Sequence, residues 1–285
     1  LGAKGPAFAA APADSTAEDI DNLRENRSVC RRHIAAPPPA AEVAMGRLPT
    51  TVAPLIGRQP ELKELDQSWQ GPRRRHGIAV VALGGQGKTT LVVNWLLHSL
   101  APMRYRGARR VFGWSFYRQG ASEDHAASAD EFFAVALKFF GDPDPSRGSP
   151  FEKSDRLVEL VRKERSLLVL DGLEPLQYAP GAEQGEGRLT DRALASLLSN
   201  LALENPGLVV VTSRAKLTDL AAYEGGFLRT IELQPFSVPD GITLLRRLHV
   251  QGTDDELAAA VQDFKGHPLA LTVFGNLLVE ARGGE

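Results

Sequence analysis

Residues 78–90 carry the stretch Ile78-Ala79-Val80-Val81-Ala82-Leu83-Gly84-Gly85-Gln86-Gly87-Lys88-Thr89-Thr90. Its apolar first part suits a strand that is buried on both faces, as in a parallel sheet. The residues from Thr89 to Leu100 have the pattern of a helix. Glycines between a buried strand and a helix let backbone N–H groups curl around phosphates, and the helix N-terminus adds a positive dipole end. The stretch therefore predicts a phosphate-binding loop that starts at Ala82.

Each residue of this loop has an expected role toward a nucleoside triphosphate, for which we expect ATP with Mg²⁺. Lys88 would reach the β- and γ-phosphates, Thr89 would place its hydroxyl on Mg²⁺, and Thr90 would contact the α-phosphate. The backbone that surrounds the phosphates would come from Gly84, Gly85, Gln86 and Gly87. The general pattern G-x-x-x-x-G-K-[ST] has a glycine where this chain has Ala82, and we expect alanine to be tolerated there if its φ is negative.

Strand and helix patterns alternate on both sides of the loop. Strands are expected at 78–83, 111–116, 167–170, 208–212 and 230–233, and helices at 60–70, 89–100, 130–140, 154–165, 191–203 and 217–223. Such alternation implies βαβ units and a parallel sheet that is covered on both faces. After residue 233 only helices are expected, at 242–248, 254–264 and 268–279. The fold class is therefore α/β, a P-loop NTPase with a three-layer parallel sheet and a small C-terminal all-helical subdomain.

Composition divides the chain into three parts. Residues 1–52 are rich in Ala and Pro, and we expect a disordered or linker segment because they cannot bury enough apolar surface. Residues 53–235 form the expected P-loop nucleotide-binding domain, and residues 236–285 form the expected helical subdomain, which is truncated. Because the first residue is Leu1 rather than Met, we expect a piece of a longer protein.

Charge and cysteine content exclude several classes of protein. A formal net charge of -2 argues against a strongly basic protein that coats nucleic acid. The single cysteine, Cys30, cannot form an internal disulfide, which fits a reducing cytosol, and we expect it to be an incidental thiol. No apolar run reaches the ~20 residues that a membrane span needs. We expect a cytoplasmic protein with no membrane partner.

Two further strand ends carry candidate residues. Asp171 ends the apolar run 167–170, where a nucleotide enzyme needs a carboxylate for Mg²⁺. Glu174 is a candidate general base that orients the attacking water, or else a surface carboxylate. Many fast ATPases carry glutamate where this chain has Gly172, so we expect slow hydrolysis. Arg214 follows the strand 208–212 and would sense the γ-phosphate as a charged donor.

Together, these pieces resemble the STAND class of signalling NTPases, in particular the NB-ARC and NACHT-like modules. The resemblance spans residues 55 to 278. It rests on the entry motif Leu55-Ile56-Gly57-Arg58-Gln59-Pro60-Glu61-Leu62, the phosphate loop, the strand ends at 167–174 and 211–214, and Gly266-His267-Pro268-Leu269-Ala270-Leu271. The last motif is similar to the G-x-P-L-A-L helix start of the family and separates this class from kinases and transporters.

The resemblance implies more about the site and the partners. It places Ile56, Gly57 and Arg58 at the nucleotide, with the backbone near Ile56 and Gly57 on adenine, and Pro268 against adenine or ribose. Arg118 is a further candidate for the phosphates. It also implies a signalling or innate-immunity switch that ADP keeps closed and that ATP opens into a homo-oligomer. The effector and sensor domains of such proteins are missing from this chain.

Two alternatives from other classes remain at this point. One is an autonomous P-loop phosphotransferase, for which the basic stretch Arg73 to Arg75 would have to act as a lid. The other is a nucleic-acid-dependent ATPase, for which Arg109 and Arg110 add local positive charge. Neither has further support, because no acceptor site is evident and no aromatic residues alternate with the basic ones.

Overall fold

The computed structural model describes residues 40–50, 55–71, 75–117, 129–179, 181–183 and 185–284. The candidates Cys30, Arg73, Arg74 and Arg118 lie outside these residues, as do residues 1–39 of the expected linker.

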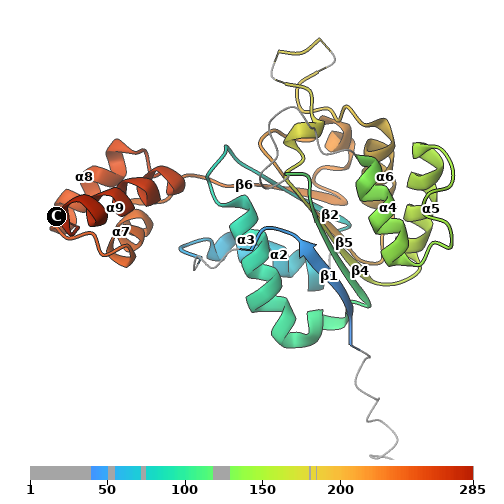
Figure 1. The fold of residues 1–285 in the computed structure, drawn as a ribbon, viewed down its shortest axis with the longest axis horizontal. Coiled ribbons are helices and arrows are strands. Elements are labelled where there is room, and N and C mark those ends of the chain that lie inside the picture. The colour runs from blue at the N-terminus through green and yellow to red at the C-terminus, as the bar shows by residue number, and fades with distance from the viewer. Residues whose placement is uncertain are drawn as a thin grey trace, which may run out of the picture. The chain divides into compact units, whose positions relative to one another are not determined.

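Within the described residues, six strands form one sheet in the order β1-β3-β4-β5-β2-β6, and each neighbouring pair is parallel (Figure 1). The strands are β1 (Glu42–Arg47), β2 (Gly77–Val81), β3 (Arg110–Ser115), β4 (Ser166–Asp171), β5 (Leu208–Ser213) and β6 (Leu228–Glu232). The strand that precedes the phosphate loop, β2, therefore lies between β5 and β6. In parallel sheets of this kind, ligands bind beyond the carboxyl ends of the strands.

Helices cover both faces of the sheet, which confirms the three-layer α/β prediction (Figure 1). One face packs against α4 (Ala129–Phe140), α5 (Pro150–Arg162) and α6 (Arg192–Leu203). The other face packs against α2 (Gln59–Gln70) and α3 (Lys88–Asn94), which continues as a π-helical segment, Trp95–Leu100. Three 3₁₀ segments complete these layers, at Ala101–Gly107, Glu174–Leu176 and Thr218–Tyr223.

The strands β2, β4 and β5 are apolar in their central residues because both of their faces are covered. Every residue of β2, β4 and β5 is buried, which is the burial expected of strands with helices on both sides. Trp114 and Phe116, at the end of β3, pack beside Phe132 of α4 in the core. The sheet therefore provides a rigid base for the loops at its carboxyl edge.

Three helices follow the last strand, as the sequence predicts. They are α7 (Val238–Arg247), α8 (Asp254–Asp263) and α9 (Pro268–Arg282), and they share a separate small core around Leu245, Val261 and Leu271. The residues Ser237, Thr253 and His267 each accept a hydrogen bond from the first turn of the helix that follows, so side-chain caps fix where these helices begin. Among the described residues, no helix combines the length and the apolar character that crossing a bilayer requires.

The structure differs from the prediction at residues 42–47, which the sequence places inside the linker. These residues form the edge strand β1, paired with β3. Most of the strand is polar or exposed, and charged side chains hold its ends: Arg47 pairs with Glu131 and lies over the ring of Trp114. Charges are common on edge strands, because they discourage pairing with other chains. The same charges hide the apolar alternation by which a strand is normally predicted.

Candidate functional site

A cavity of about 450 Å³ lies at the carboxyl edge of the sheet. This volume is within the range of small-molecule and cofactor sites. Segments that are distant in sequence line it: Leu55, Ile56, Arg58, Gly84 to Thr90, Tyr117, Gly172, Glu174, Thr212, Arg214, Phe236, Leu244, Pro268, Leu269 and Thr272. The cavity thus collects nearly all the site residues that the sequence predicts.

The phosphate loop has the backbone conformation that its glycines allow. Gly85 and Gly87 adopt left-handed φ values of 74° and 90°, which side chains with a Cβ avoid. Ala82 is not among the residues with positive φ in the described part of the chain. Alanine therefore causes no backbone strain at the position where the general motif has glycine.

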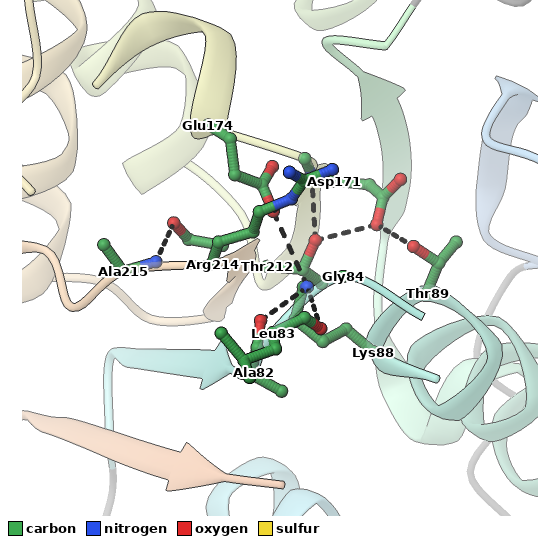
Figure 2. A network of polar contacts seen from close by, with 12 residues as sticks. Ala82, Leu83, Gly84, Lys88, Thr89, Asp171, Glu174, Thr212, Arg214 and Ala215 are labelled. Atoms are coloured by element: carbon green, nitrogen blue, oxygen red, sulfur yellow. Dashed lines mark hydrogen bonds and ion pairs between the residues drawn. The ribbon is translucent and has the colours of Figure 1, made fainter. Parts of the chain in front are cut away.

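Lys88 is buried at the first turn of α3, and its ammonium group is held by the loop itself (Figure 2). Its Nζ donates to the carbonyl oxygens of Ala82 at 2.8 Å and Leu83 at 3.3 Å, and lies 3.6 Å from Oε1 of Glu174. Burial lowers the pKa of Lys88 below its ordinary value, and the Glu174 carboxylate opposes this shift. The positive charge is thus poised at the loop, where an anion would contact it.

Asp171 is the centre of a hydrogen-bond network that joins three strands and the phosphate loop (Figure 2). Its Oδ1 accepts from the hydroxyls of Thr89 at 2.6 Å and Thr212 at 2.8 Å, and its Oδ2 accepts from Ser115 at 3.1 Å. Thr212 also accepts from the N–H of Gly172 at 2.8 Å. The carboxylate is 2% exposed, so these contacts fix its direction.

Glu174 and Arg214 lie beside this network. Glu174 starts a short 3₁₀ segment, and its Oε1 is 3.9 Å from Nε of Arg214. Its Oε2 is buried and has no hydrogen-bond partner among the residues that the structure describes. A buried oxygen without a partner is costly, so it favours a further donor in the cavity, such as water or a ligand.

Tyr117 occupies the space next to Gly172, which is the residue that follows the Mg²⁺ candidate Asp171. A Cβ atom on Gly172 would lie 2.3 Å from Cδ2 of Tyr117, and Gly172 itself has a left-handed φ of 71°. Burial, followed by the negative charge of Glu174, raises the pKa of Tyr117 to about 12. The phenol is therefore a neutral hydrogen-bond donor at physiological pH.

The entry motif contributes a second wall of the cavity. Ile56 is buried and lines the cavity together with Arg58, whose Nη2 donates to the carbonyl of Gln86 at 3.4 Å. The guanidinium of Arg58 also lies over the ring of Phe236, 5.2 Å from its centroid. Gly57 has a left-handed φ of 63°, and a Cβ there would lie 3.0 Å from the Asp240 carboxylate. This wall therefore contacts the start of the helical segment.

The start of α9 forms the third wall. Pro268, which the resemblance places against adenine or ribose, lines the cavity together with Leu269. The N–H of Leu269 donates to the carbonyl of Gly85 at 3.3 Å, and Nε2 of His267 lies 3.0 Å from the carbonyl of Gly84. The helical segment is thus in direct contact with the phosphate loop.

These residues fit a nucleotide with Mg²⁺. The loop offers glycine-borne N–H groups and a buried ammonium group, and the oxygens of Thr89 and Asp171 are hard ligands of the kind that Mg²⁺ prefers. In the described part of the chain, no group of three or more His, Cys, Asp or Glu side chains could hold a metal ion. A bound Mg²⁺ would therefore complete its coordination with phosphate oxygens and water, as is usual for this ion.

The sequence did not single out four residues that the structure places here. Thr212 and Ser115 orient Asp171, Tyr117 covers Gly172, and His267 contacts Gly84. A signal existed for Thr212, because it ends an apolar strand in a parallel sheet. The contact of His267 with the loop arises from packing between distant segments, and no local pattern encodes it.

Comparisons with known proteins agree with this geometry. The NACHT domain family matches residues 78–251, which is more than half of the chain. No curated protein matches the chain in sequence. Two solved structures share the fold at 16% identity and a TM-score of 0.51, each over 80% of this chain. They are a STAND protein with a tetratricopeptide repeat sensor from Pyrococcus horikoshii and a Walker-type ATPase of Pyrococcus abyssi.

The coverage of these two relatives differs. The chain spans 30% of the length of the Pyrococcus horikoshii protein and 68% of the Pyrococcus abyssi ATPase. The phosphate loop, the carboxylate at the end of β4 and the family match lead to the same conclusion. The chain belongs to the NACHT family and is a nucleotide-binding NTPase of the STAND class.

Proposed function

We propose that this chain is the ATP/ADP-binding switch core of a STAND-type signalling or defence protein, with slow ATP hydrolysis. The observation that carries the proposal is the meeting of Thr89 and Asp171 at 2.6 Å, with Lys88 directly before Thr89 in the first turn of α3. Two oxygens suited to Mg²⁺ and one cation suited to phosphate thus converge at one end of the cavity. The apolar end, near Ile56 and Pro268, is where we place adenine.

The described side chains have separate roles in this proposal. Thr89 and Asp171 hold Mg²⁺, whose charge would stabilise the phosphates, and Thr212 keeps the carboxylate in place. Lys88 exchanges its carbonyl contacts for phosphate oxygens. Glu174, with one buried oxygen lacking a partner, orients the attacking water. Arg214 lies at the edge of the cavity, where it can contact the γ-phosphate.

Slow hydrolysis follows from the surroundings of Asp171. A glutamate side chain at position 172 would have to displace the ring of Tyr117, because even a Cβ would lie 2.3 Å from it. Glu174, three residues after Asp171, is then the candidate for the general base. Its Oε1 lies 3.6 Å from Nζ of Lys88 and 3.9 Å from Nε of Arg214. The carboxylate that would act as the base is thus already engaged by two cations.

Switching requires that ATP and ADP favour different arrangements of the helical segment. The contacts of this segment with Gly57 and with the phosphate loop provide a physical route for such a preference. We propose that ADP favours these contacts and that ATP weakens them and permits homo-oligomerisation. We also propose that the protein to which this core belongs carries sensor and effector domains and is cytoplasmic.

The first experiment identifies the nucleotide that co-purifies with the chain, after denaturation and chromatography, and then measures turnover of added ATP. Stoichiometric ADP with little turnover is the expected result. Lys88→Ala should lose the nucleotide, because it removes the buried ammonium group, while circular dichroism shows an unchanged fold. Brisk turnover by an initially empty wild-type chain would contradict the proposed switch, and equal ADP affinity in Lys88→Ala would remove Lys88 from the site.

A further inference from the structure

Two consecutive carbonyls of the phosphate loop are bound by the first turn of α9. The N–H of Leu269 donates to the carbonyl of Gly85 at 3.3 Å, and Nε2 of His267 lies 3.0 Å from the carbonyl of Gly84. The two donors come from a segment that is more than 180 residues away in the chain. The loop that would hold the phosphates is therefore held from outside the sheet domain.

The helix cap determines the proton position on His267. Its Nδ1 accepts a hydrogen bond from the N–H of Ala270 at 3.2 Å, so Nδ1 carries the lone pair. A neutral imidazole then has its proton on Nε2, which makes Nε2 a donor. The carbonyl of Gly84 is an acceptor at the right distance for this proton. Capping α9 and binding the loop are thus two consequences of one tautomer.

Holding these carbonyls also fixes two N–H groups of the loop. The carbonyl of Gly84 shares a peptide plane with the N–H of Gly85, and the carbonyl of Gly85 shares one with the N–H of Gln86. In a trans peptide the C=O and the N–H point in opposite directions. The contacts with α9 therefore set the direction of two N–H groups in residues that line the cavity.

The start of α9 approaches the phosphate loop so closely that it leaves no room for a Cβ at position 85. A Cβ on Gly85 would lie 2.7 Å from Cβ of Leu269 and 2.8 Å from Cε1 of His267. Glycine at this position therefore serves the left-handed turn of the loop and the close approach of α9.

We propose that His267 is a positioning residue that orders the phosphate loop through the carbonyl of Gly84, so that docking of α9 and phosphate binding stabilise each other. The proposal rests on the nucleotide binding described above. It predicts that loss of the Gly84 contact weakens binding of the phosphate part of the nucleotide and leaves binding of the nucleoside part unchanged.

The test compares three variants of the full chain with the wild type. His267→Asn keeps an oxygen that can cap α9 but is shorter than imidazole, and His267→Ala removes both contacts. Thr253→Ala is the matched control, because it removes the cap of α8 in the same helical segment and lies outside the cavity lining. Thermal unfolding confirms that each variant is folded.

Two readouts are measured. The first is hydrogen exchange of residues 84–90 without nucleotide, and the second is competition of ADP and of adenosine against a fluorescent ADP analogue with Mg²⁺. For His267→Asn and His267→Ala we expect exchange to be faster and ADP affinity to fall about five-fold, the ratio for one hydrogen bond of ~1 kcal/mol. Thr253→Ala should match the wild type in both, and adenosine should bind all four proteins equally.

Other outcomes overturn the proposal. Unchanged exchange in His267→Asn would mean that the contact does not order the loop. Faster exchange with unchanged ADP affinity would mean that the order has no role in phosphate binding, and an equal loss in Thr253→Ala would assign the effect to the stability of the helices. If the wild-type chain binds no ADP, the proposed function fails, and the exchange comparison still decides whether His267 orders the loop.

Discussion

Gly172→Ala tests how tightly the surroundings of Asp171 are packed. Gly172 has a left-handed φ of 71°, which costs a residue with a Cβ ~1–2 kcal/mol. The new Cβ would lie 2.3 Å from Cδ2 of Tyr117, so the ring must move by about 1 Å to restore ordinary contact. Tyr117 is 43% exposed, so its ring can move toward solvent, and the displacement costs a further ~1 kcal/mol, the lower end of the cost of an extra carbon in a packed site. We therefore expect a total loss of ~2–3 kcal/mol in the free energy of unfolding.

A double-mutant cycle with Tyr117→Ala separates the two contributions. Without the ring, Gly172→Ala should cost only the backbone strain of ~1–2 kcal/mol. Urea unfolding of the four proteins gives the coupling energy between the two positions, and ATP turnover of the same proteins shows whether Asp171 has moved. Equal costs of Gly172→Ala in both backgrounds would refute the view that Tyr117 fills the space beside Gly172.

Two further predictions concern the same network. Asp171→Asn keeps an oxygen for Thr89 but removes the charge, so ADP affinity measured by calorimetry should fall about ten-fold or more with Mg²⁺ and stay unchanged with EDTA; a loss of equal size in EDTA would contradict the Mg²⁺ assignment. Because the folded-state pKa of Tyr117 is raised from 10.0 to about 12, the stability it contributes is fully present below pH 10 and is lost as pH rises through about 12. The difference in phenolate absorbance between wild type and Tyr117→Phe should have its midpoint near pH 12, and a midpoint near 10 would show that the phenol is not shielded.

The sequence predicted the sheet, and it placed the candidate site residues at one edge of that sheet, because both inferences depend on local chemistry and on one rule of topology. Buried parallel strands are apolar throughout, and their carboxyl ends meet at one edge, so Asp171 and Arg214 could be assigned to the same site as Lys88 before any geometry was known. The structure places Lys88 and Arg214 in the lining of one cavity, and Asp171 accepts a hydrogen bond from Thr89 of the same lining. The edge strand β1 was missed because its charged end residues flank a short stretch that has no polar–apolar alternation.

The contacts of Tyr117 and His267 could not be predicted for a different reason. Each depends on the distance between segments that are far apart in the chain: 2.3 Å from the ring of Tyr117 to a Cβ on Gly172, and 3.0 Å from His267 to Gly84. Residue types alone would place a tyrosine after a strand in many environments. Sequence patterns indicate which groups are suited to phosphate and Mg²⁺, whereas packing determines how firmly those groups are held.

The backbone angles of the phosphate loop explain which of its positions require glycine. The general pattern of the loop treats two glycine positions alike, which are Ala82 and Gly87 in this chain, yet Gly87 and the neighbouring Gly85 have left-handed φ values here while Ala82 does not. Alanine is therefore compatible with the first position, because only left-handed positions exclude a Cβ on backbone grounds. At Gly85 a Cβ is excluded for two reasons, because the φ value is left-handed and because the Cβ would collide with His267 and Leu269. The departure at Ala82 is thus compatible with the backbone of the loop, while the same substitution at Gly85 would strain the loop and separate it from α9.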